Sequence, residues 1–142
     1  MNALQLKLCD IQGRLFELFA YAKYDAESLV KTFMCGELAK DLDSEYNRMQ
    51  WMGEEYLLEE LTSVNGDKLA AKPTTTTYDK DVLFWVGYTY RYWHFYTGED
   101  SAKIYRQAPW HTMNANYLMF HTMDPSLAVD DLKEIHEQRA KR

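Results

Sequence analysis

Cysteine is scarce in this sequence, and long apolar runs are missing from it. The chain of 142 residues has two cysteines, Cys9 and Cys35, which form no CxxC pair. We therefore expect both to be small buried hydrophobic residues rather than redox groups or metal ligands. No apolar run approaches the roughly 18–20 residues that span a bilayer, and residues 1–8 lack the regions of a secretory signal. We expect no membrane partner and a cytoplasmic location.

The short motifs of common enzymes are also missing. The sequence has no GxSxG, no Cys-His signature and no glycine-rich phosphate loop. Its four histidines show neither the HExxH nor the HxxxH spacing that places two imidazoles on one helical face. We therefore expect no metal and no cofactor. An enzyme remains an alternative only if the fold brings its catalytic groups together from separate parts of the sequence.

Charge of one sign is in excess only in the first half of the chain. The net charge is −6, and residues 1–64 carry 6 basic and 12 acidic side chains, whereas residues 65–142 carry 10 of each. An acidic surface repels phosphate backbones, and no basic recognition helix is visible, so we expect no nucleic-acid partner. A basic protein partner would be attracted instead.

Helical periodicity dominates the first half. Apolar residues recur at steps of three and four over residues 3–21, which predicts a helix. Asp25 is the predicted N-cap of a second helix, which ends or bends at Gly36, with a short segment continuing after it. Ser44 is a candidate cap for a further helix that runs through EEYLLEEL to about residue 63.

The stretch between the two halves lacks an amphipathic period. It contains Asn65-Gly66, a proline and four consecutive threonines, so residues 65–78 are predicted to be an exposed linker. The expected organisation is therefore an acidic helical half over residues 1–64 and an aromatic-rich helical half over residues 79–142, within one domain. Weak similarity between the halves leaves a duplicated helical unit as a hypothesis.

Aromatic residues, in contrast, are abundant. The stretch from Phe84 to Tyr96 contains eight aromatics and a histidine in thirteen positions. Its alternating tyrosines suit a strand, but residues 82–97 contain no turn signal and are long for a strand. Asp79 or Asp81 can cap a helix there and Gly98 can end it, so a helix is predicted.

The role of these aromatics has several interpretations. A helix that is apolar all round is normally buried, so they are expected chiefly to form a core, with a minority on a docking face. Base stacking is disfavoured because Arg91 is nearly alone among them. We expect Arg91 to pack between rings or to pair with a carboxylate across the core.

The end of the chain supplies the remaining helices. Helices are predicted over residues 101–107 and 110–121, and Asp124-Pro125 begins a last one that buries Leu127, Val129 and Leu132. His121 is expected to interact with the C-terminal end of its helix and Asp124 to cap the next. The predicted fold is thus an all-α, single-domain bundle of six to seven helices.

A run of motifs in the second half reads YRYWHFYTGEDSAKIYRQAP and then MNANYLMFHTMDPSLAVDDL. This pattern, over about residues 82–133, resembles a family of small uncharacterised bacterial helical proteins. Members are commonly encoded beside predicted ADP-ribosyltransferase-like toxins and are suspected antitoxin or accessory proteins. The segment FMCGELAKDLDSEYNRMQWMGEEYLLEEL resembles an N-terminal extension of some members.

The resemblance implies a non-enzymatic, protein-binding component that neutralises or assists a toxin-like partner. The positions that it implies for partner binding are Tyr88, Arg91, Tyr92, Tyr96, Tyr105, Tyr117, His121 and Asp124. Some of these are expected to be core and cap positions. The acidic first half would steer the partner and exposed aromatics would pack against it. The alternative is a small enzyme or ligand-binding protein with a pocket around Tyr88, Arg91, His94 and His121.

Overall fold

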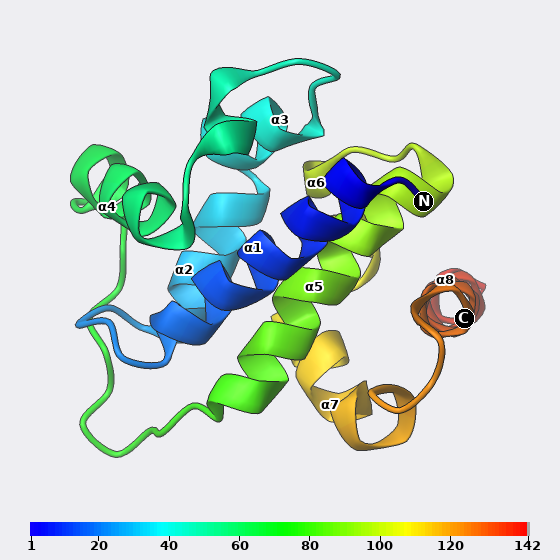
Figure 1. Cartoon of the computed structure of the whole chain (residues 1–142). Coiled ribbons are helices and arrows are strands. Elements are labelled where there is room, and N and C mark those ends of the chain that lie inside the picture. Colours follow the sequence, from blue (N-terminus) through cyan, green and yellow to red (C-terminus); the bar gives the residue numbers. More distant parts are fainter. Residues whose placement is uncertain (142) are drawn as a thin grey trace.

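The chain folds into a single all-helical domain, and the computed structural model describes residues 1–141 of it (Figure 1). The elements are α1 (Ala3–Phe19), α2 (Ala26–Met34), α3 (Glu37–Asp43), the 3₁₀ turn η1 (Arg48–Trp51), α4 (Glu54–Asn65), α5 (Lys80–Thr97), α6 (Ser101–Gln107), α7 (Trp110–Phe120) and α8 (Pro125–Ala140). The predicted fold class is confirmed. The described residues contain eight α-helices rather than six to seven, because the segment after Gly36 forms a helix of its own.

Helices α1 and α5 lie side by side at the centre of the domain (Figure 1). Gly87 permits their close crossing, because a Cβ atom there would lie 2.5 Å from the carbonyl oxygen of Gln12 and 2.8 Å from the ring of Phe16. The Gln12 side chain donates in turn to the Gly87 carbonyl over 3.0 Å. Since α1 belongs to the first half of the sequence and α5 to the second, the two halves share one core.

The aromatic helix α5 begins and ends as its sequence predicts. The side chain of Asp79 accepts a hydrogen bond from the backbone of Asp81 over 2.8 Å, and Gly98 ends the helix in the left-handed conformation, with φ of 80°. Tyr90 and Trp93 are fully buried. The predicted helix is confirmed, but of the eight aromatics from Phe84 to Tyr96 only these two are fully buried; five are half-buried and Tyr96 is exposed.

A buried polar cluster ties α5 to three other helices. Arg91 is 1% exposed, and its guanidinium donates to Gln12 of α1 over 2.7 Å and to Asp43 of α3 over 2.5 Å. It also donates to the hydroxyl of Ser101 in α6, which donates to Asp43 over 2.7 Å. A buried guanidinium requires such partners because it cannot give up its charge. The predicted pairing of Arg91 with a carboxylate across the core is confirmed.

The segment between α4 and α5 is tethered rather than free. Backbone hydrogen bonds join Asp25 to Ala70 over 2.9 Å and Lys72 to Lys23 over 3.2 Å. Tyr78 donates to the carboxylate of Asp25. The exposed linker is therefore fastened to the loop between α1 and α2, which holds the start of α5 in place.

Three expectations about single residues were wrong. Ser44 ends α3, and the next turn begins at Asn47, whose side chain accepts from the backbone of Met49. Cys35 is exposed because it lies at the C-terminal cap of α2, whereas Cys9 is buried as expected. Leu127 is 54% exposed because the buried face of α8 starts one residue later.

Candidate functional site

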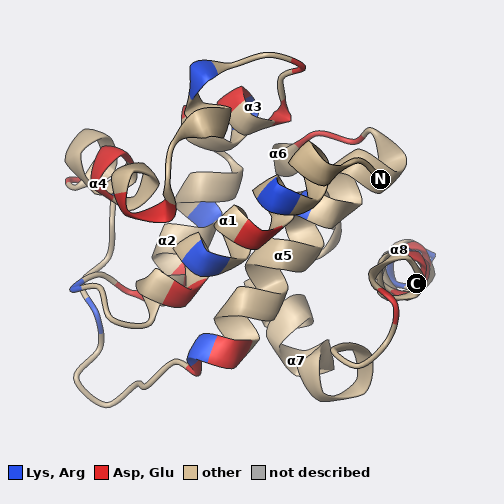
Figure 2. Ribbon diagram, viewed as in Figure 1, with Lys and Arg blue, Asp and Glu red and all other residues tan. Residues whose placement is uncertain are grey.

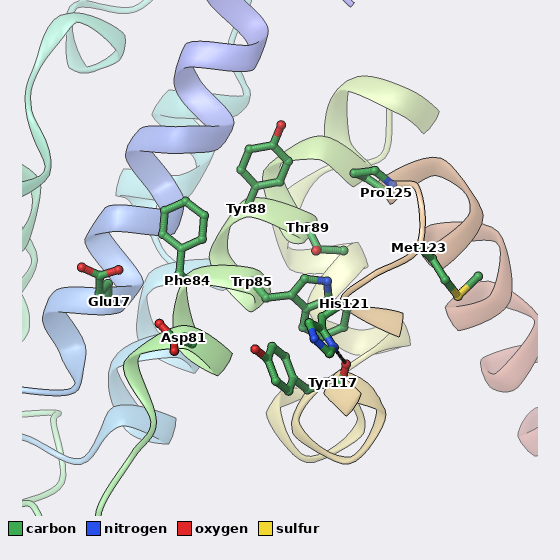
Figure 3. A pocket seen from close by; sticks show the side chains of 10 residues that line it. All are labelled: Glu17, Asp81, Phe84, Trp85, Tyr88, Thr89, Tyr117, His121, Met123 and Pro125. Atoms are coloured by element: carbon green, nitrogen blue, oxygen red, sulfur yellow. Dashed lines mark hydrogen bonds between the residues drawn. The ribbon is translucent and has the colours of Figure 1, made fainter. Parts of the chain in front are cut away.

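A cleft of about 640 Å³ opens between the N-terminal half of α5 and the C-terminal end of α7 (Figure 3). One residue of α1 and the segment leading into α8 complete its wall. The lining residues are Glu17, Asp81, Phe84, Trp85, Tyr88, Thr89, Tyr117, His121, Met123 and Pro125. A volume in this range is typical of sites that hold a small ligand or a partner's side chain.

Helical spacing brings the aromatic rings of the cleft together. Phe84 and Tyr88 are four residues apart on α5, and their rings stack with centroids 6.2 Å apart. On the opposite wall, Tyr117 and His121 are also four residues apart and stack at 4.3 Å. The ring of Trp85 packs edge to face against that of Tyr117, with centroids 5.8 Å apart. This contact connects the two walls.

His121 is fixed at the end of α7. Its Nδ1 lies 2.8 Å from the carbonyl oxygen of Tyr117, which also accepts a hydrogen bond from the backbone N–H of His121 over 2.9 Å. The expected interaction of His121 with the C-terminal end of its helix is confirmed. This hydrogen bond and the ring stacking join the Tyr117 and His121 side chains.

The charged groups of the cleft are both acidic. Among the described residues that line it, Glu17 and Asp81 are carboxylates, and none is a lysine or arginine. Figure 2 shows α7 without charged residues, both acidic and basic positions along α1, and one of each at the start of α5, where Lys80 precedes Asp81. Burial raises the pKa of the Tyr117 phenol, and the negative charges of Asp81 and Asp79 raise it further. Both of the charged residues that raise the pKa of Tyr117 are therefore acidic.

A second hollow continues from the cleft along α1. It has a volume of about 440 Å³ and shares Glu17 and Phe84 with the first. Its other charged residues are Asp10, Arg14 and Glu54, of which the first two pair with each other over 2.9 Å. Carboxylates therefore line both hollows.

The structure gathers only part of the predicted partner-binding set. Tyr88, Tyr117 and His121 lie together in the cleft. Arg91 and Tyr105 are buried in the core, at 1% and 7% exposed, and are not at a surface.

The other three predicted positions lie outside the cleft. Tyr92 and Tyr96 neighbour each other on α5, and the Tyr96 hydroxyl donates to Asp130 of α8 over 3.1 Å. Asp124 is the N-cap of α8, as expected, and accepts from the backbone of Ser126 over 2.9 Å. Tyr96 thus connects α5 to α8, and Asp124 caps α8.

The pocket proposed as an alternative forms only in part. Tyr88 and His121 line the cleft, but Arg91 and His94 do not. His94 faces the other end of α5, where its Nδ1 lies 2.7 Å from the Glu99 carbonyl oxygen and 3.6 Å from Asp43. No group of three or more His, Cys, Asp or Glu side chains in residues 1–141 could hold a metal ion.

Sequence reasoning missed most of the cleft. Phe84 and Trp85 belong to the aromatic stretch, but their sequence does not indicate which rings stay accessible. The ring of Phe84 rests over Gly13, where a Cβ atom would lie 2.9 Å from it, so this face depends on the crossing of α1 and α5. Glu17 lines the site because α1 crosses α5, and no motif in the sequence marks it as a site residue.

Comparison with protein-family models, with curated proteins and with solved structures finds no match to this chain. The resemblance to proteins encoded beside toxins therefore stays a prediction. Within residues 1–141, no helix combines the length and apolarity needed to cross a bilayer.

Proposed function

We propose that this chain is a non-catalytic binding protein that receives part of a partner protein in the cleft between α5 and α7. The observation that carries the proposal is the cleft itself, in which half-buried rings of two helices surround a hollow of about 640 Å³. Aromatic residues in such half-buried positions dominate the binding energy of many interfaces. The rings of Tyr90, Trp93 and Tyr105, in contrast, are buried in the core.

The partner that we propose is a toxin-like protein encoded nearby, which this chain neutralises or assists. Its identity rests on the sequence resemblance and not on the cleft. The acidic first half supports a basic partner, because 12 acidic and 6 basic side chains over residues 1–64 attract positive charge.

Affinity co-purification from the native host tests this function. The tagged chain is compared with a Tyr117→Ala/His121→Ala double variant, which removes one wall of the cleft. We expect a stoichiometric partner with the unchanged chain and about a tenfold loss or more with the variant, because central aromatics contribute about 1–2 kcal/mol or more each. Circular dichroism checks that the variant stays folded.

The matched control is Tyr46→Ala. Tyr46 is 87% exposed and is not among the residues that line the cleft, so this variant loses an equivalent ring elsewhere. It is expected to recover the partner as the unchanged chain does. Equal recovery with all three proteins would contradict the assignment of the cleft.

The cleft volume also favours a second candidate, a small-molecule ligand. Recovery of the chain alone, without any partner, would favour this candidate. Ligand screening by tryptophan fluorescence would then follow, with the Trp85→Phe variant to identify the contribution of Trp85.

A further inference from the structure

The aromatic rings of the cleft have electron-rich faces that can attract an occupant. Phe84, Trp85, Tyr88 and Tyr117 come from two helices and surround one hollow (Figure 3). The face of an aromatic ring attracts a cation, tryptophan most strongly, and arginine is the cation most often found there. An aromatic lining alone would also accept an apolar side chain, so the charged groups decide between the two.

Two carboxylates complement a cation in this cleft. Asp81 is exposed on the first turn of α5, and Glu17 is half-buried on α1. Neither makes an ion pair with any residue in the described part of the chain, while the lining includes no lysine or arginine. A guanidinium can donate to a carboxylate through two N–H groups while its plane stacks on a ring, which an ammonium cannot do.

We infer that the cleft binds an arginine side chain of the partner protein, its guanidinium stacked on the rings and hydrogen-bonded to Glu17 or Asp81. This inference rests on the proposed function for the identity of the molecule that carries the arginine. The second hollow extends the same surface, since Glu54 there is a third carboxylate without an ion pair within residues 1–141. A basic segment would therefore find negative charge on both sides of Phe84.

Nuclear magnetic resonance titration with three blocked peptides tests the inference. The probes are acetyl-Gly-Arg-Gly-amide, its lysine analogue and its citrulline analogue, which keeps the shape of arginine without the charge. The readout is the indole N–H signal of Trp85, and the signal of Trp51 is an internal reference because Trp51 is 72% exposed and outside the cleft. We expect the arginine peptide to shift the Trp85 signal and the citrulline peptide to bind about tenfold more weakly.

Variants with equal charge changes separate the site from the overall charge. The Glu17→Gln/Asp81→Asn variant is expected to bind the arginine peptide about tenfold more weakly. The Glu45→Gln/Asp67→Asn variant changes two exposed carboxylates outside the cleft and should leave the affinity unchanged.

Three results would overturn the inference: equal binding of the arginine and citrulline peptides, equal binding of the lysine peptide, or equal weakening by both double variants. A partner that needs Tyr117 but not Glu17 and Asp81 would also overturn it while leaving the proposed function in place. Peptide binding as expected, without a protein partner, would support the arginine site and contradict the proposed function.

Discussion

Glu99 accepts hydrogen bonds from side chains of three different helices. Its carboxylate accepts from Trp93 over 2.9 Å, from Gln107 over 3.0 Å and from Lys133 over 2.6 Å, and it pairs with Lys103 over 3.2 Å. These donors lie on α5, α6 and α8. Burial alone would raise the pKa of Glu99, but the four donors outweigh it and lower the pKa to about 2. The ionised carboxylate therefore joins three helices.

Because the pKa of Glu99 is lowered, we expect part of the free energy of unfolding to be lost in acid. Because the pKa of Glu99 is lower in the folded protein than its ordinary value of 4.5, its contribution is complete above about pH 5 and is lost as the pH falls toward about 2. We expect the unfolding free energy of the unchanged protein to fall over this range by roughly 2–3 kcal/mol more than that of Glu99→Gln. Urea unfolding at a series of pH values measures both, and parallel curves would contradict the prediction.

At the scale of an element, the crossing of α1 and α5 determines the shape of the site. The crossing depends on Gly87, and it carries Glu17 and the Phe84 face into the cleft. Gly87→Ala is expected to destabilise the protein by about 1–3 kcal/mol despite the higher helix propensity of alanine, because the methyl group would meet the backbone of α1. Chemical unfolding measures the change.

Gly53→Ala is the control for that substitution. A Cβ atom at Gly53 would have no atom within 4 Å, but Gly53 is the N-cap of α4, where alanine is less favourable than glycine. Its replacement is therefore expected to lower the unfolding free energy by about 0.5–1 kcal/mol, less than the replacement of Gly87. Equal effects at the two glycines would mean that the crossing tolerates a side chain at Gly87.

The helices themselves were largely predictable, because their signals are local. Asp25, Asp79 and Asp124 cap their helices as the sequence indicates, and Gly98 ends α5. The exception is the region after Ser44, where the helical spacing of apolar residues masked a break into η1 and α4.

For the molecule as a whole, the sequence indicated which side chains are buried better than which side chains are accessible. A carboxylate partner for Arg91 was expected, but Asp43 lies 48 residues away and could not be identified before the helices were placed. Three of the eight implied partner-binding positions line the cleft, since a tyrosine suits a core and a docking face equally well. The accessible face of α5 depends on packing between distant segments.

Position-specific photocrosslinking in the native host tests most directly whether the cleft is the binding surface. Benzoylphenylalanine replaces Tyr117 in one strain and Tyr46 in another, so that both probes stand at tyrosine positions of the same chain. If the cleft binds the partner, we expect a discrete crosslinked product with one partner from position 117 and none from position 46. The same partner crosslinked from position 46, and not from position 117, would contradict this expectation.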